Sequence, residues 1–214
     1  MTSAARQPLK TLLERHPVLE SCKDALWTAV EAIIACYEKG GKLLVCGNGG
    51  SASDSQHIVG ELMKGFVLPR KLNHATQKSL RDTCPNSADS LIAHLQSALP
   101  AISLVSETAL STAYANDVAP ELCFAQQVLG YGNPGDILWG ISTSGNSANV
   151  LYAAQVAKAK GLTVIGMTGQ SGGKLKEWVD ICMMAPAEET YRIQEYHLPL
   201  YHAVCLAVEV HFFS

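Results

Sequence analysis

The stretch Leu44-Val45-Cys46-Gly47-Asn48-Gly49-Gly50-Ser51 leads from a short apolar run into a glycine-rich loop, and a helical pattern follows it. The stretch Leu138-Trp139-Gly140-Ile141-Ser142-Thr143-Ser144-Gly145-Asn146-Ser147 repeats this order further along the chain. Buried parallel strands are short apolar runs, and glycine permits the tight turn from such a strand into a helix. Both stretches therefore predict an α/β fold with these loops at the carboxyl ends of strands, where such sheets bind ligands.

The alternation of strands and helices continues along the chain after residue 40. Strands are expected at 42–46, 101–104, 136–141, 163–167 and 181–185. Helices are expected at 52–66, 120–130, 147–160 and from about 190 to the end. This order predicts a three-layer sandwich around a central, mostly parallel five-stranded sheet, in a single domain of 214 residues.

Two segments lie outside this alternation. The N-terminal part, about 5–39, is helical, and apolar residues recur at helical spacing over 18–37, so it covers the domain or joins a subunit interface. The segment 67–99 is an insertion with one expected helix at 87–99, whose shared face carries Leu91, Ile92, Leu95 and Leu99. Such a long connection is either a lid or a solvated excursion, and as a lid it would offer an anion Arg70, Lys71, Lys78 and Arg81.

The two glycine-rich loops favour an anionic ligand. A helix that begins at such a loop presents unpaired N–H groups and the positive end of its dipole. Neither loop has the spacing of a nucleotide-binding motif. The alternative is a pair of plain turns with Ser51 and Ser147 as N-caps. Capping does not need as many hydroxyls as the second loop has, so we favour a phosphate ligand bound by Ser142, Thr143, Ser144 and Ser147.

Composition narrows the class of protein. The formal net charge is −3 with no run of like charges, which gives no indication of nucleic acid or a membrane surface as partner. No apolar stretch is long enough to span a bilayer, and the first residues lack the apolar core of a signal peptide. Seven scattered cysteines without a C-x-x-C pair are expected to be reduced core residues, so we expect a cytoplasmic protein.

Candidate reacting groups occur in two helices. His57 and Glu61 are four residues apart and share a helix face, a spacing that suits a divalent metal such as zinc, or acid–base chemistry. The alternative is an ordinary polar pair on a helix surface. The last helix adds Gln194 and His202, eight residues apart, and Pro199 between them is expected to bend it. We expect His197 to be a satisfied core histidine.

Four stretches carry a family resemblance: 46–51 with His57 and Glu61, 141–150 (ISTSGNSANV), 168–174 (TGQSGGK), and 192–202, which opens with RIQE. They resemble the phosphoheptose isomerases of the sugar-isomerase (SIS) domain class. The resemblance implies a flavodoxin-like fold, a homotetramer and conversion of sedoheptulose 7-phosphate to D-glycero-D-manno-heptose 7-phosphate by proton transfer through an enediol.

The resemblance also implies roles for residues. Glu61 and His202 would be base and acid, and one zinc ion per subunit would be held by His57, Glu61, Gln194 and His202. The sugar phosphate would contact Asn48, Gly49, Gly50, Ser51, Glu61, Asn116, Asp117, Ser142, Thr143, Ser144, Ser147 and Gln194.

Three departures from the family pattern bear on the identity of the sugar. The insertion exceeds the family's short link by roughly 25 residues. Glu107 and Tyr191 stand where the family commonly has aspartates. The alternatives are an isomerase or sensor of another phosphosugar, and a non-catalytic SIS protein such as the DiaA-like regulators that bind the initiator protein DnaA. Because those regulators lack the glutamate and the second histidine, the presence of Glu61 and His202 favours the isomerase.

Overall fold

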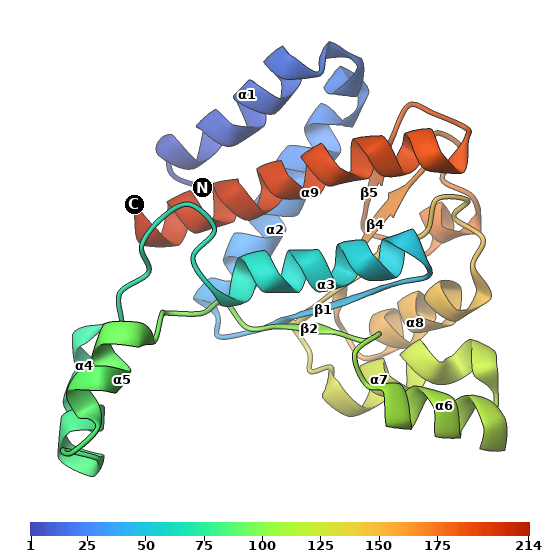
Figure 1. Cartoon of the computed structure of the whole chain (residues 1–214). Coiled ribbons are helices and arrows are strands. Elements are labelled where there is room, and N and C mark those ends of the chain that lie inside the picture. The colour runs from blue at the N-terminus through green and yellow to red at the C-terminus, as the bar shows by residue number, and fades with distance from the viewer.

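The computed structural model describes all 214 residues and forms helical layers on both faces of a parallel sheet (Figure 1). The strands are β1 (Leu43–Gly47), β2 (Ala101–Ser103), β3 (Ile137–Ile141), β4 (Thr163–Thr168) and β5 (Ile181–Met184). Their order across the sheet is β2-β1-β3-β4-β5, and every neighbouring pair is parallel. This is the flavodoxin-like strand order, and the predicted fold class is confirmed.

The strands send alternate side chains into two cores. On one face, Val45, Trp139 and Ile165 pack under the helices α2 (Lys23–Glu38), α3 (Gly50–Met63) and α9 (Thr190–Phe213). On the other face, Leu44, Leu138 and Val164 pack under α7 (Cys123–Tyr131) and α8 (Ala148–Ala159). All of these strand residues are buried, which is why each strand is a continuous apolar run in the sequence.

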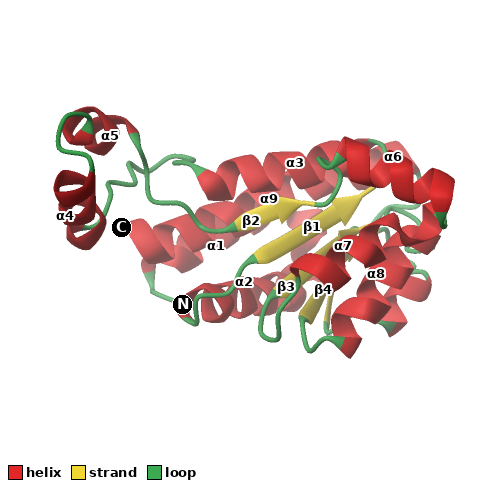
Figure 2. Cartoon of the chain, turned by 90° about the horizontal axis from the view of Figure 1, so that it is seen from below, coloured by secondary structure: helices red, strands yellow, loops and turns green.

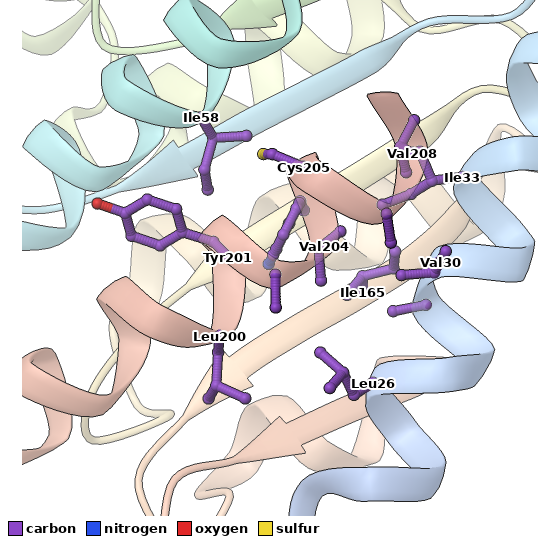
Figure 3. Packing of buried hydrophobic residues seen from close by; sticks show 14 of the residues in the cluster. Leu26, Val30, Ile33, Ile58, Ile165, Leu200, Tyr201, Val204, Cys205 and Val208 are labelled. Atoms are coloured by element: carbon purple, nitrogen blue, oxygen red, sulfur yellow. The ribbon is translucent and has the colours of Figure 1, made fainter. Parts of the chain in front are cut away.

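The face under α2 and α9 holds the larger core. Figure 3 shows Leu26, Val30 and Ile33 of α2 facing Leu200, Val204 and Val208 of α9, with Ile58 of α3 nearby. A further helix, α1 (Gln7–Arg15), packs on the outer side of α9. Pro199 does not interrupt α9, which runs unbroken to Phe213, and Glu195, whose carbonyl loses its helical partner, is exposed to water.

The insertion differs most from its prediction. It holds two helices, α4 (His74–Thr83) and α5 (Ala88–His94), which stand apart from the body of the molecule in two perpendicular views (Figures 1 and 2). The helix expected at 87–99 is present as α5 but ends at His94, since Leu95 is already extended and exposed, and α4 was not expected. Leu99 is buried but lies outside any helix. Its N–H donates to the carbonyl of Leu62 (3.0 Å), which ties this extended segment to the end of α3.

Helix α6 (Thr108–Asp117) follows β2 and was also not predicted. None of its residues is buried, and its sequence therefore lacks the apolar stripe by which a helix is recognised. Short 3-10 segments complete the chain at Ala4–Arg6, Pro17–Cys22, Pro120–Leu122 and Lys174–Glu177. None of the helices is both long and apolar enough to cross a membrane.

Candidate functional site

Both glycine-rich loops lie at the carboxyl edge of the sheet, where β1 leads into α3 and β3 leads into α8. Gly49 and Gly145 have φ values of 55° and 64°, a left-handed conformation that side chains other than glycine rarely adopt. Gly145 also lies directly against the main chain of Gly172 and Gly173, so a Cβ atom has no room there. The glycines thus fix how the main chain turns into each helix.

Side chains tie the two loops together. Asn48 and Asn149 exchange two amide hydrogen bonds of 2.9 Å each, which join the first loop to the first turn of α8. The hydroxyls of Ser142 and Ser147 are 2.9 Å apart. Ser147 holds the N-cap position of α8, as the alternative expected, whereas the N-cap of α3 is Gly49 and not Ser51, and neither helix has a side-chain capping bond. The N–H groups of Ser51, Ala52 and Ser53 already bond to the carbonyls of Asn48 and Gly49, and the hydroxyls of Ser142 and Ser147 bond to each other, so a ligand would compete with these bonds.

A third loop, absent from the expected site, completes this edge. Gly169 donates its N–H to the carbonyl of Thr143 (2.9 Å), and Lys174 donates its N–H to Oδ1 of Asn146 (3.1 Å). The two loops enclose a polar hollow of about 330 Å³, lined by Thr143, Ser144, Asn146, Gly169, Gln170, Ser171, Ala187, Glu188 and Ile193. Sequence reasoning missed Gln170, Ser171 and Glu188, although the glycine-rich run at 169–173 was a usable signal.

The candidate reacting groups meet where α3 packs against α9. Nε2 of His57 is 3.0 Å from Oε1 of Glu61, and Nδ1 of His57 is 2.9 Å from the hydroxyl of Tyr201. The rings of His57 and His202 stand edge to face with centroids 5.0 Å apart. His57, Glu61 and His202 therefore lie together. Tyr201 was not expected, because a tyrosine in an apolar helix carries no signal of this contact.

Burial sets the charge balance of this group. Glu61 is 8% exposed, and its Oε2 has no hydrogen-bond partner, with Nζ of Lys64 3.6 Å away. Nε2 of His202 is likewise buried without a partner. Burial and the neighbouring His57 lower the pKa of His202, while Glu61 acts in the opposite direction. His202 is thereby held neutral near pH 7, with one ring nitrogen able to donate.

Gln194 lies against the start of α3, beside the first loop. Its side-chain amide lies directly on Gly50, at the start of α3, in the space that a Cβ atom on Gly50 would occupy. Glycine at this position is what allows the first turn of α9 to approach α3 so closely. Gln194 therefore stands beside the first loop, at the end of α3 away from Glu61.

The donor types at this group suit zinc, which binds imidazole nitrogens and carboxylate oxygens. Oε2 of Glu61 and Nε2 of His202 are both buried without a hydrogen-bond partner, although Nζ of Lys64 is 3.6 Å from Oε2 of Glu61. The geometry of a metal site is not assembled, since no three histidine, cysteine, aspartate or glutamate side chains are grouped closely enough to hold an ion.

Three sets of expected residues lie elsewhere. Asn116 and Asp117 hydrogen bond to each other at the exposed end of α6 (2.9 Å), with no bond to the loops. Arg70 is buried in an ion pair with Glu209, so the expectation that it meets an anion is wrong, and Lys78 pairs with Asp82. His197 is a core residue, as expected, with Nε2 3.2 Å from the carbonyl of Thr168.

Comparison with known proteins gives a consistent result. The SIS domain family model matches residues 9–89 and 84–169. The phosphoheptose isomerase of Roseiflexus is 41% identical over 91% of this chain and 86% of its own length. That of Synechocystis is 39% identical over 100% of this chain and 96% of its own length.

Solved structures agree with the sequence matches. The phosphoheptose isomerase of Neisseria gonorrhoeae matches with a TM-score of 0.71 and 32% identity, over 96% of this chain and 91% of that one. The enzyme of Francisella tularensis matches with a TM-score of 0.73 and 30% identity, over 98% of this chain and 100% of that one.

Proposed function

This chain belongs to the SIS domain family and, within it, to the phosphoheptose isomerases, and from this membership we propose that it converts sedoheptulose 7-phosphate into D-glycero-D-manno-heptose 7-phosphate. The observation that carries the proposal is that Glu61 and His202 both lie next to His57. His57 and Glu61 are on α3, the helix that starts at the first loop, and His202 is on α9. No comparison supports the non-catalytic alternative.

Isomerisation of a ketose phosphate needs a fixed phosphate and a movable proton. The loop hydroxyls of Ser51, Ser142, Thr143, Ser144 and Ser147, with the first N–H groups of α3 and α8, would hold the phosphate. Glu61 lies ten residues beyond Ser51 on α3, about 15 Å along the helix axis at 1.5 Å per residue. This separation suits a linear sugar phosphate whose two ends are recognised by different groups.

The proton transfer is assigned to Glu61 and His202. Oε2 of Glu61 is free of hydrogen bonds and would take the proton from C1 of the ketose while His202 supplies a proton to the C2 oxygen, so that an enediol forms. Nε2 of His202 is also free, and the lowered pKa of this ring favours the neutral form, which donates a hydrogen bond to a sugar oxygen. Glu61 would then return its proton to C2 while the C1 hydroxyl gives a proton back to His202, which completes the change from ketose to aldose and restores both groups.

We also propose that zinc binds here. The resemblance implies His57, Glu61, Gln194 and His202 as its ligands. The closeness of His57, Glu61 and His202 supports three of them, whereas Gln194 lies at the other end of α3. When bound, the ion would polarise the sugar oxygens. A carboxylate that holds a metal is a weaker base, so we expect zinc content and activity to be separable.

A homotetramer is the proposed assembly. A groove of about 660 Å³ runs between α1 and α9, and His202, Leu198 and Leu206 are among the residues on its wall. Leu198 is a large apolar side chain that is 41% exposed in the single chain. A second copy seated in this groove would cover these side chains and close the site beside His202. All seven cysteines are free, which fits the proposed cytoplasmic location.

The test is direct. Purified protein is incubated with sedoheptulose 7-phosphate and, separately, with pentose and hexose phosphates, and the products are followed by NMR. Formation of D-glycero-D-manno-heptose 7-phosphate only from the heptulose supports the proposal. Turnover of another sugar phosphate in its place would identify a different isomerase. If none of the sugar phosphates is converted, the proposal that the protein is an isomerase is overturned. Light scattering at micromolar concentration tests the tetramer in the same sample, and a monomer would overturn that part.

A further inference from the structure

A buried ion pair lies at the root of the insertion, away from the groups assigned to the reaction. The side chains of Arg70 and Glu209 are both 0% exposed, and Nε of Arg70 donates to Oε1 of Glu209 over 2.8 Å. Arg70 precedes α4, and Glu209 lies in the last turns of α9. The pair therefore joins segments 139 residues apart in the sequence.

Arg70 uses its remaining donors on the end of α3. Nη1 donates to the carbonyl of Leu62 over 2.6 Å, and Nη2 donates to the carbonyl of Glu61 over 2.8 Å. In a continuing helix these carbonyls would bind the N–H groups of Gly65 and Phe66. Those N–H groups bind Gln96 and Glu209 instead. Arg70 thus replaces the missing helical bonds, one of them on Glu61 itself.

Glu209 holds the chain that follows α3. Its carboxylate accepts three main-chain N–H bonds, from Phe66 (2.7 Å), Val67 (2.9 Å) and Leu68 (3.2 Å). The ring of Phe66 in turn lies against His202, with centroids 5.4 Å apart. The guanidinium of Arg70 also stacks 4.8 Å over the ring of Phe213. All three nitrogens of the guanidinium donate a hydrogen bond, and the pair contacts the surroundings of both Glu61 and His202.

Stability alone is a weak explanation for this arrangement. Removing two charges from water is expensive, and apolar residues of similar volume often replace a buried ion pair with no loss of stability. What an apolar pair cannot do is to bind two carbonyls and three N–H groups in fixed directions. The contacts made by Arg70 and Glu209 are of this directional kind.

We propose that Arg70 and Glu209 are positioning residues of the isomerase site, which hold Glu61 through its main chain and place Phe66 against His202. The proposal rests on the proposed function. It gives the root of the insertion a second role, since the same bonds that anchor the insertion set the geometry of the two reacting groups. The phosphate loops make no contact with the pair, so phosphate binding should not depend on it.

The experiment compares Arg70→Lys, Glu209→Gln and the double variant Arg70→Met/Glu209→Leu with the wild-type enzyme. Lysine keeps the charge, but its three donors sit on one nitrogen, so it cannot reproduce the planar fork that reaches Glu209 and the two carbonyls from three separate nitrogens. Lys78→Met/Asp82→Leu is the matched control, because it removes an exposed ion pair from the same insertion. Urea unfolding, affinity for inorganic phosphate by calorimetry, and kcat and KM are measured for each variant.

The positioning role predicts a split between these readouts. For the double variant we expect a folded protein of lowered stability in urea, since five main-chain groups lose their partners, with phosphate affinity within threefold and kcat lowered at least tenfold. Arg70→Lys should lower kcat in the same way, and the control should change neither kcat nor KM. A folded double variant with kcat within twofold of wild type would overturn the proposal, as would equal losses in kcat and phosphate affinity.

A second measurement keeps the proposal testable if the double variant does not fold. Phe66→Leu leaves the ion pair in place and removes only the ring that lies against His202. In chelator-treated protein, the imidazole NMR signal of His202 reports the environment of its ring. The signal is assigned by its loss in His202→Gln. Arg70→Lys should move this signal as Phe66→Leu does, and an unmoved signal would overturn the link to His202. If wild type isomerises no sugar phosphate, the proposed function fails, and this signal alone decides the positional claim.

Discussion

The phosphate loops and the α3–α9 contact are held together by different kinds of interaction. In the loops, glycines and main-chain bonds fix the backbone, and Gly145 leaves no room for a side chain. Between α3 and α9, side chains distant in sequence fix the geometry, as in the His57–Tyr201 bond across 144 residues. The difference implies that binding and chemistry depend on separate contacts, so substitutions should separate them.

The largest expected effect tests the chemical side of this comparison. Glu61→Gln keeps the size of the side chain but removes the proton acceptor, so we expect a loss of about 10²–10⁴ in kcat, typical of a lost general base. Phosphate affinity, measured by calorimetry, should stay near the wild-type value because the loops are unchanged. His202→Asn should act similarly.

Combining the two changes sharpens the result. Since groups that act as a unit are not additive, the double variant should be little worse than either single variant. Exchange of the C1 or C2 proton with solvent, followed by NMR, is the measurement. A Glu61→Gln enzyme that exchanges this proton at the native rate would leave the reaction without its base.

The second effect tests the binding side. Ser144→Asp places a carboxylate on the wall of the polar hollow, where it would repel a phosphate group, so we expect affinity for the sugar phosphate to fall about 100-fold or more, equivalent to about 3 kcal/mol. Ser144→Ala is the control, because it removes the hydroxyl without adding charge and should lose less. Circular dichroism and urea unfolding should show an intact fold. Binding of the aspartate variant at wild-type affinity would refute the assignment of phosphate to this loop.

A third effect separates stability from both functions. Burial lowers the pKa of His197 from 6.5 to about 4, although its bond to the carbonyl of Thr168 opposes the shift. Between pH 6.5 and about 4, His197 therefore binds a proton in the unfolded chain but not in the folded one. The contribution of His197 to stability is fully present above pH 6.5. It is lost as the pH falls toward about 4, a loss of about 3 kcal/mol at 1.36 kcal/mol per pKa unit.

The measurement for His197 is urea unfolding at pH 7 and at pH 5. His197→Gln keeps a donor for Thr168 but does not titrate, so it should lose part of the fall in stability over this range. An unchanged pH dependence in this variant would show that other groups cause the fall.

The same contrast explains what the sequence could predict. All five strands were placed to within one residue at each end, because buried parallel strands are continuous apolar runs and glycine marks their ends. Helix α6 was missed because none of its residues is buried, and the helix at 87–99 was extended too far because Leu99 has apolar spacing without helical structure. Local patterns predicted local structure.

Contacts across the fold were less accessible to sequence reasoning. His57, Glu61 and His202 were placed together through the family resemblance, and the structure brings them together. Their supports were missed, since nothing near Arg70 indicates that its partner is Glu209, or that a basic residue in a polar insertion is fully buried. A side chain's partner depends on how distant elements pack, which periodicity does not report.

The smallest expected effect concerns the bond between the two loops. Asn149→Ala removes both amide hydrogen bonds to Asn48, and because these bonds are at the surface we expect a loss of about 1 kcal/mol or less in stability. Phosphate affinity should fall a few-fold, since the first turns of α3 and α8 lose their direct side-chain link, while kcat at saturation should be unchanged. A double-mutant cycle with Asn48→Ala measures the coupling, and independent losses at the two positions would show that the link does not help to hold the phosphate site. A loss of kcat in Asn149→Ala would contradict the separation itself, because Asn149 touches neither Glu61 nor His202.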